Sequence, residues 1–169
     1  MSTILNQSRQ YQGKDRQYKS EKGGQQPSIT HETLAQIILN GDAVKMVEEA
    51  DKLGNQLART DNLMTSQIRA IFGEVRRLQG LLSFSGLDED ISSIHEQKES
   101  AFRKLYLLKP KMAYRKEKEK GYGVKNLVAV LDPALSLVFQ DVEKREERFV
   151  HFVEFFEAIL AYHRAYGGK

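Results

Sequence analysis

Basic side chains gather between residues 103 and 125, where nine Lys or Arg residues stand against two acidic ones. On a helix, residues seven apart fall nearly on one line, and residues three or four apart are neighbours. Lys104, Lys111 and Lys118 would therefore form a stripe, which Arg115 joins. At 1.5 Å per residue the stripe is roughly 21 Å long, which suits contact with successive phosphates of one nucleic-acid strand.

Two further features accompany this stripe. Tyr114 projects within it, and an aromatic ring among cations can stack on a base or a sugar. Arg69 and Arg76 lie seven apart on a separate predicted helix, and arginine matches phosphate geometry better than lysine does. A groove between the two helices is the predicted path of an RNA or DNA strand.

The end of the basic segment also fits an ordinary solvated helix, because Glu117 and Glu119 alternate with lysines. For Lys116 and Lys120 we favour this solvated interpretation. The excess of charge is local, since beyond residue 30 the whole chain carries 21 basic and 21 acidic groups. The sequence thus predicts a nearly neutral protein with one positive face.

No comparable pattern indicates catalysis or metal binding. The chain has no cysteine, and its histidines form no metal-ligand pair such as His-Glu-x-x-His. Glycine-rich phosphate loops, nucleophile elbows and paired-acid motifs are missing from the sequence as well. We therefore expect no enzymatic activity, no cofactor and no bound metal. The histidines are His31, His95, His151 and His163.

The elements that must position the basic stripe are helices. Residues 1–28 are polar, rich in Gln, Ser, Gly and Lys, and are predicted to be a disordered tail. Residues 29–169 show only helical spacing of apolar side chains, which predicts one all-α domain, a bundle of five or six helices. Thr30 and Asp42 have the side chains of helix N-caps, and a third helix is expected from Thr65 to about Ser83.

A longer fourth helix is predicted from Ile91 past Met112, with a kink at Pro110 because proline lacks an amide donor. Gly121 and Gly123 would end it. The last helix is expected from Val142 to His163.

Aromatic residues widen the apolar face of the last helix beyond the ~100° that an ordinary surface helix needs. Phe152, Phe155, Tyr162 and Tyr166 belong to this face. Either the helix is central to the bundle, or these four side chains form a subunit interface. The second alternative would suit a homodimeric protein-interaction adaptor that does not bind nucleic acid directly.

The chain contains no run of the ~18 apolar residues that a membrane span requires, and its N-terminus lacks the apolar core of a signal peptide. The expected location is the cytoplasm.

Three strings together resemble one known family. They are Leu-Met-Thr-Ser-Gln-Ile-Arg at residues 63–69, Leu-Lys-Pro-Lys-Met-Ala-Tyr at residues 108–114, and the aromatic C-terminal string at residues 155–169. In order, spacing and terminal position they are similar to the small subunit of the type III-A CRISPR effector, the Csm complex. The resemblance covers residues 42–169.

The resemblance implies an all-helical, non-catalytic subunit present in more than one copy, which lies beside the guide RNA and helps to hold the target RNA in antiviral defence. Other subunits, including a repeated backbone subunit and a large polymerase-like subunit, would be its partners and would carry out catalysis. The resemblance also implies that Arg69, Lys109 and Lys111 occupy motif positions that face RNA in the family. Lys118 stands where the family often has an arginine, so it keeps the charge but not the bidentate fork.

Overall fold

The computed structural model describes residues 27, 29–83 and 91–169. The regular secondary structure of these residues is entirely helical, which confirms the predicted all-α class. The predicted tail at residues 1–28 lies outside the described residues except for Pro27. The elements are α1 (His31–Asn40), α2 (Ala43–Asn55), the π-helix η1 (Gln56–Thr60), α3 (Thr65–Ser83), α4 (Ile91–Tyr106), α5 (Leu108–Lys118), α6 (Gly123–Val138) and α7 (Arg145–Ala165).

The first helices begin at the residues whose side chains were expected to cap them. Thr30 accepts a hydrogen bond from the amide of Thr33 at 3.1 Å, and Asp42 accepts one from the amide of Lys45 at 3.0 Å. Between the two helices, Gly41 has a φ of +66°, a left-handed conformation that glycine adopts without strain.

The predicted long fourth helix is divided into α4 and α5 at Leu107. Pro110 is the third residue of α5 and has no amide hydrogen to donate to the carbonyl of Tyr106 four residues earlier. The interruption therefore falls one turn before the proline, as the missing donor requires. If α4 and α5 are counted as two halves of one kinked helix, the described residues contain six α-helices, within the predicted number.

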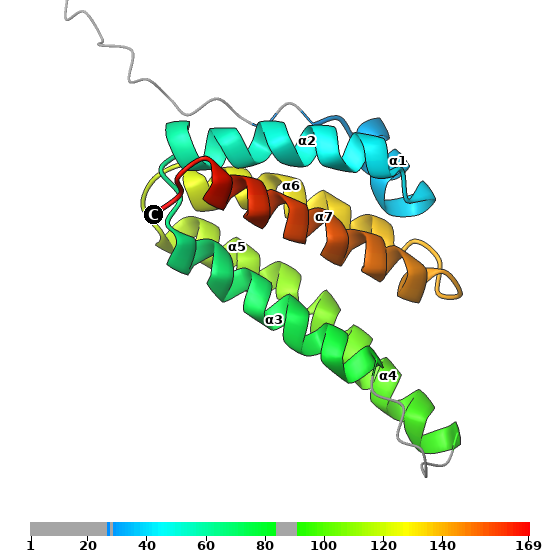
Figure 1. Ribbon diagram of the computed structural model, residues 1–169. Coiled ribbons are helices and arrows are strands. Elements are labelled where there is room, and N and C mark those ends of the chain that lie inside the picture. Colours follow the sequence, from blue (N-terminus) through cyan, green and yellow to red (C-terminus); the bar gives the residue numbers. More distant parts are fainter. Residues whose placement is uncertain (1–26, 28, 84–90) are drawn as a thin grey trace, which may run out of the picture.

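Helix α7 occupies the centre of the molecule. Figure 1 shows it between α2 and α3, and it packs against α1, α2, α3 and α6. Phe152 and Phe155 are completely buried inside the single chain. The structure thus corrects the expectation that these two phenylalanines form a subunit interface: the apolar face is wide because α7 has neighbours on several sides.

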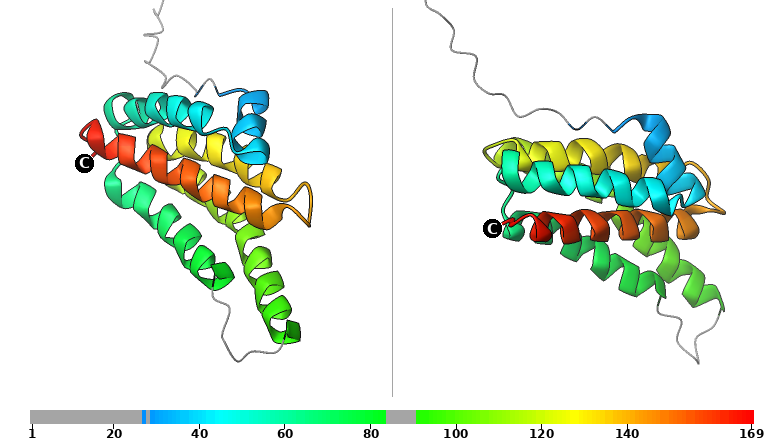
Figure 2. Two further views of the ribbon diagram at one scale, coloured as in Figure 1. Left: turned by 45° about the vertical axis from the view of Figure 1, so that its right-hand side comes forward. Right: turned by 45° about the horizontal axis from the view of Figure 1, so that its top comes forward.

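Helices α1 and α2 cover one side of the α6–α7 layer, and α3, α4 and α5 lie along the other (Figure 2). The ring of Phe72 on α3 meets that of Phe156 on α7 edge-on, with centroids 5.0 Å apart. At the N-terminal end of α7, Arg145 pairs with Glu99 of α4. These contacts attach the α3–α4 pair to the body of the bundle.

The last helix begins at Arg145, three residues later than expected. Asp141 accepts a hydrogen bond from the amide of Glu143 at 3.0 Å, which forms a local turn, and Val142 within it is exposed. Gly123 does not end a helix but begins α6, where a Cβ would lie 2.8 Å from Leu63. Among the described residues, no helix meets the length and hydropathy that a transmembrane span requires.

The C-terminal residues fold back onto the start of α3. His163 is fully buried, and its Nε2 lies 2.7 Å from the carbonyl oxygen of Leu63. Thr65 donates its hydroxyl to the carbonyl of Gly168 at 3.1 Å and its amide to that of Lys169. These bonds fix where α3 begins and so hold one wall of the site described next.

Candidate nucleic-acid interface

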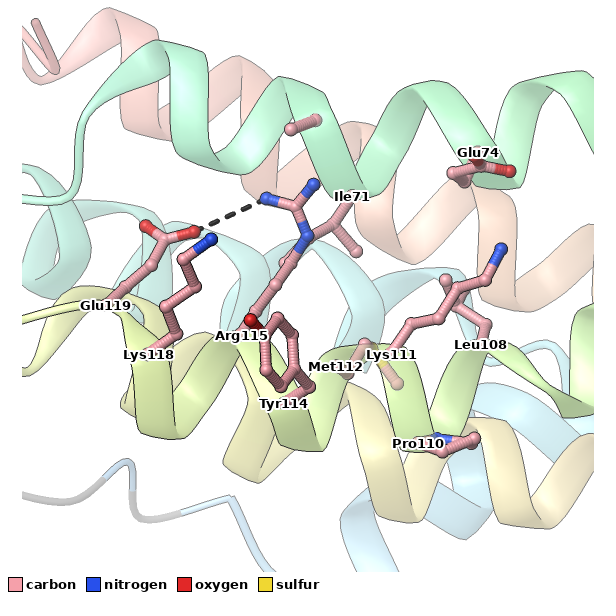
Figure 3. A pocket seen from close by; sticks show the side chains of 11 residues that line it. Ile71, Glu74, Leu108, Pro110, Lys111, Met112, Tyr114, Arg115, Lys118 and Glu119 are labelled. Carbon is pink, nitrogen blue, oxygen red and sulfur yellow. Dashed lines mark hydrogen bonds and ion pairs between the residues drawn. The ribbon is translucent and has the colours of Figure 1, made fainter.

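A pocket of about 740 Å³ lies between α3 and α5. Its floor is apolar, because Ile71 of α3 and Leu108 and Met112 of α5 are buried there. Figure 3 shows Arg115 and Lys111 extending from α5 toward α3 across this space. The pocket lies where a groove between the third helix and the basic segment was predicted, but of the two predicted basic stripes only the one on α5 lines it. Its lining residues are Ala70, Ile71, Glu74, Leu108, Pro110, Lys111, Met112, Tyr114, Arg115, Lys118 and Glu119.

Three cations of α5 line the pocket: Lys111, Arg115 and Lys118. Their spacings of four and three residues place them on one face of the helix, as the sequence indicated. Arg115 is half-buried and lies 3.3 Å from the Glu119 carboxylate. The two lysines are exposed and make no ion pair with any described residue. Their ammonium groups are therefore available to an anionic ligand.

Tyr114 stands beside these cations with 63% of its surface exposed. The ammonium of Lys118 lies 5.6 Å from the centroid of its ring, a cation–π distance. A large exposed aromatic side chain next to lysines offers a stacking surface for a base or a sugar.

Two carboxylates, each held by an arginine, complete the walls. Glu74 accepts a hydrogen bond from Arg77 at 3.0 Å, and Glu119 is paired with Arg115. The Arg77 hydrogen bond, with smaller contributions from the charges of Arg77, Lys111 and Arg115, lowers the pKa of Glu74 below its ordinary value. The two carboxylates offset two of the three positive charges of α5, so the lining residues keep a net charge of one positive unit.

Three α3 residues of this region were not among the predicted site residues: Gln67, Ala70 and Glu74. Gln67 and Glu74 are seven residues apart, on the face that carries Ile71. That spacing is the signal that could have identified them, but polar residues at helical spacing are too common on surface helices to stand out.

Arg69 and Arg76 do not line the pocket. Helical geometry places them roughly 150° around α3 from the face that carries Ala70, Ile71 and Glu74. Arg76 instead pairs with Glu157 of α7 at 2.9 Å. The expectation that these arginines share a groove with the α5 cations is therefore wrong. Any RNA contact that they make would lie on a different face of α3.

Lys104 is separated from Lys111 by the interruption at Leu107. It lines a smaller depression of about 390 Å³ beside Leu81 and Glu96, between the end of α3 and α4. The predicted continuous stripe is therefore shortened to residues 111–118, roughly 10 Å at 1.5 Å per residue.

Lys109 faces α6 instead of the pocket. Its ammonium donates to the hydroxyl of Ser136 and lies 3.4 Å from the carboxylate of Asp132. The side chain is 24% exposed, so its charge is largely committed to joining α5 to α6. In the structure this lysine joins two helices of the same chain. The RNA-facing role that the resemblance implies for it stays a prediction.

Tyr162 and Tyr166, the other two expected interface residues, are partly exposed on the C-terminal part of the chain. Their rings stack with centroids 6.4 Å apart. The Tyr166 hydroxyl donates to Asp51 at 2.5 Å, and the Arg59 guanidinium lies 4.9 Å from its ring centroid. Unlike the two buried phenylalanines, these tyrosines have surface that another molecule could contact.

Two of the described histidines contact backbone carbonyl oxygens of the fold. His151 lies 3.0 Å from the carbonyl oxygen of Ile38, and His163 bonds to Leu63 as described above. Among the described residues, no group of three or more His, Cys, Asp or Glu side chains is arranged to hold a metal ion.

Comparison with known proteins gave one family match. A sequence model described as Csm2 Type III-A matches residues 40–169, which contain all of α2 to α7 and the pocket between α3 and α5. Neither the curated proteins nor the solved structures that were searched gave a match.

Proposed function

The chain belongs to the Csm2 family, the small subunits of type III-A CRISPR complexes, and from this premise we propose that it binds the sugar-phosphate backbone of RNA along α5. The cations Lys111, Arg115 and Lys118 would contact successive phosphates, while Tyr114 would stack on an adjacent sugar or base. Binding would be independent of sequence, because base pairing between guide and target supplies the specificity of RNA-guided systems.

The observation that carries this proposal is the convergence of three α5 cations, two of them exposed lysines, on one pocket with an exposed tyrosine beside it. A lysine that merely keeps a helix soluble has no reason to share a concave surface with other cations. With Glu74 and Glu119 counted, the lining has three cations against two carboxylates, and this excess of positive charge favours an anionic ligand.

The subunit would act in the cytoplasm as a non-catalytic scaffold that contacts guide and target RNA, the repeated backbone subunit, the large polymerase-like subunit and further copies of itself. Tyr162 and Tyr166 are the proposed contacts with a neighbouring subunit. The family's small-subunit role supports this assignment, and His151 and His163 are engaged in contacts with backbone carbonyl oxygens. The adaptor alternative is weaker, because Phe152 and Phe155, which would have formed much of its interface, are buried.

A matched pair of variants tests the proposal in the assembled complex. Lys111→Ala with Lys118→Ala removes the two exposed pocket cations, whereas Lys116→Ala with Lys120→Ala removes the same charge from lysines outside the pocket. We expect only the first pair to weaken target RNA binding, measured by filter retention. Equal effects of the two pairs would show that general charge, and not this surface, attracts the RNA.

A further inference from the structure

Phosphate binding leaves most of the α3–α5 pocket without a role. Backbone phosphates need only the lysine and arginine ends at its rim. Below the rim lie the buried side chains of Ile71, Leu108 and Met112, which are 2%, 4% and 0% exposed. A space of about 740 Å³ is within the ~300–1,000 Å³ of ordinary small-molecule pockets. A strand that lay only across the rim would leave this space unfilled.

We propose that the pocket receives one unpaired nucleobase of the bound RNA strand. The inference rests on the proposed function, because the base would enter from a strand whose phosphates are held by Lys111 and Lys118. Its ring faces would pack against the exposed apolar lining residues, Ala70 of α3 and Pro110 of α5, above the buried floor.

The polar groups of the pocket fit the edge of a base. Nucleobase edges carry both hydrogen-bond donors and acceptors. The Glu74 carboxylate on the α3 wall can accept from a base amino or imino group, and the Arg115 guanidinium on the α5 wall can donate to a base oxygen or ring nitrogen. Figure 3 shows these two side chains on facing helices with the apolar residues between them.

The charge of the rim favours a nucleotide over an apolar side chain of a protein partner. An apolar anchor would have to cover Lys111 and Lys118, and burying unpaired ammonium groups is costly. A nucleotide brings its own phosphate to these cations while its base fills the apolar space. One ligand therefore satisfies both parts of the pocket.

Ala70→Phe tests the inference, because Ala70 is exposed on α3, lines the pocket and carries no charge. Ala129→Phe, at an exposed alanine of α6 outside the pocket, is the matched control, and circular dichroism checks that both variants fold. The probes are an adenine-only RNA oligonucleotide and a ribose-phosphate strand of the same length that lacks bases.

We expect the unaltered chain to bind the adenine strand at least tenfold more tightly than the base-less strand, because one base in the pocket contributes about tenfold and Tyr114 can stack on another. Ala70→Phe should reduce this preference by about tenfold without changing the affinity for the base-less strand, and Ala129→Phe should preserve it. In methyl-labelled protein, the Met112 resonance should shift with the adenine strand but not with the base-less one.

The failures are distinguishable. If neither strand binds, the proposed function itself is wrong. If both strands bind equally well, or if Ala70→Phe keeps the full preference for bases, the strand is held at the rim and the base-pocket inference is overturned. Loss of complex assembly in Ala70→Phe with the base preference intact would assign the pocket to a protein partner instead.

Discussion

Gln67 donates a hydrogen bond from its Nε2 to the carboxylate of Glu119 at 2.5 Å, and so joins the first turns of α3 to the end of α5. The same carboxylate receives the guanidinium of Arg115. Glu119 thus fixes the separation of the two helices at one end of the pocket and also holds one of the three cations in place.

Replacing Glu119 with glutamine should strengthen RNA binding. The variant keeps an oxygen that can accept from Gln67, but it removes one negative charge from the wall of the pocket and frees Arg115. The expected gain is roughly twofold at low salt, because the lost repulsion acts through solvent over several ångströms. Fluorescence anisotropy with a labelled single-stranded RNA measures this, and a loss of affinity would mean that the pairing with Arg115 matters more than the charge.

Two glycines on helices should respond to alanine in opposite directions. At Gly54 of α2, a Cβ would lie 2.5 Å from the Cβ of Tyr162 and 2.9 Å from the backbone nitrogen of His163, whereas at Gly73 of α3 it would meet nothing within 4 Å. We expect Gly54→Ala to lower the free energy of unfolding by roughly 1–3 kcal/mol, because α2 and α7 would have to separate. Gly73→Ala should raise it by about 0.5–1 kcal/mol through helix propensity alone.

Urea denaturation followed by circular dichroism gives both values. An unchanged stability in Gly54→Ala would mean that the α2–α7 contact is looser than the structure shows. The Gly73 variant controls for any general effect of adding a methyl group to a helix.

The Tyr166 hydroxyl should ionise at a higher pH than an ordinary tyrosine. Its hydrogen bond to Asp51, followed by burial and by the charge of that carboxylate, raises the pKa of Tyr166 above its usual value near ~10. A group whose pKa is raised by folding stabilises the fold below its unfolded-state pKa, and this contribution disappears as the pH rises through the folded-state value. The stability should therefore decrease in the alkaline range above pH ~10.

Carbon-13 NMR of the tyrosine ring carbon bonded to the hydroxyl follows this titration directly. In Asp51→Asn the pKa of Tyr166 should fall toward the ordinary value, because the amide cannot offer the same charge. A titration of Tyr166 that is identical in the two proteins would contradict the hydrogen bond.

Local signals in the sequence predicted the helices well. The caps at Thr30 and Asp42 depend on side chains that bond to amides three residues later, so they are properties of the segment alone. The interruption near Pro110 is equally local, because it follows from one missing amide. Such features appear in any fold that uses these helices.

Which residues line the site depends on how the helices pack against one another, and short stretches of the sequence do not reveal that packing. Lys104 and Lys111 have the spacing of one line, yet the break at Leu107 places them in different depressions. Arg76 and Lys109 carry the expected charge but pair with Glu157 and Asp132 on other helices. Only the assembled bundle shows which cations have partners.

The aromatic face of α7 illustrates the same limit. A wide apolar stripe indicates that the helix is buried on several sides. It does not distinguish burial by the same chain from burial by another chain. The structure answers this for Phe152 and Phe155, which are covered by the chain itself.

The salt dependence of single-stranded RNA binding by the purified protein tests the central claim most directly. Each phosphate contact on a single strand contributes about 0.7 to the slope of log affinity against log salt. The slope, which is negative, should therefore become less steep by about 1.4 in the variant with Lys111→Ala and Lys118→Ala. It should stay unchanged in the variant with Lys116→Ala and Lys120→Ala. Equal slopes for the unaltered protein and both variants would contradict the assignment of the RNA path to the α3–α5 pocket.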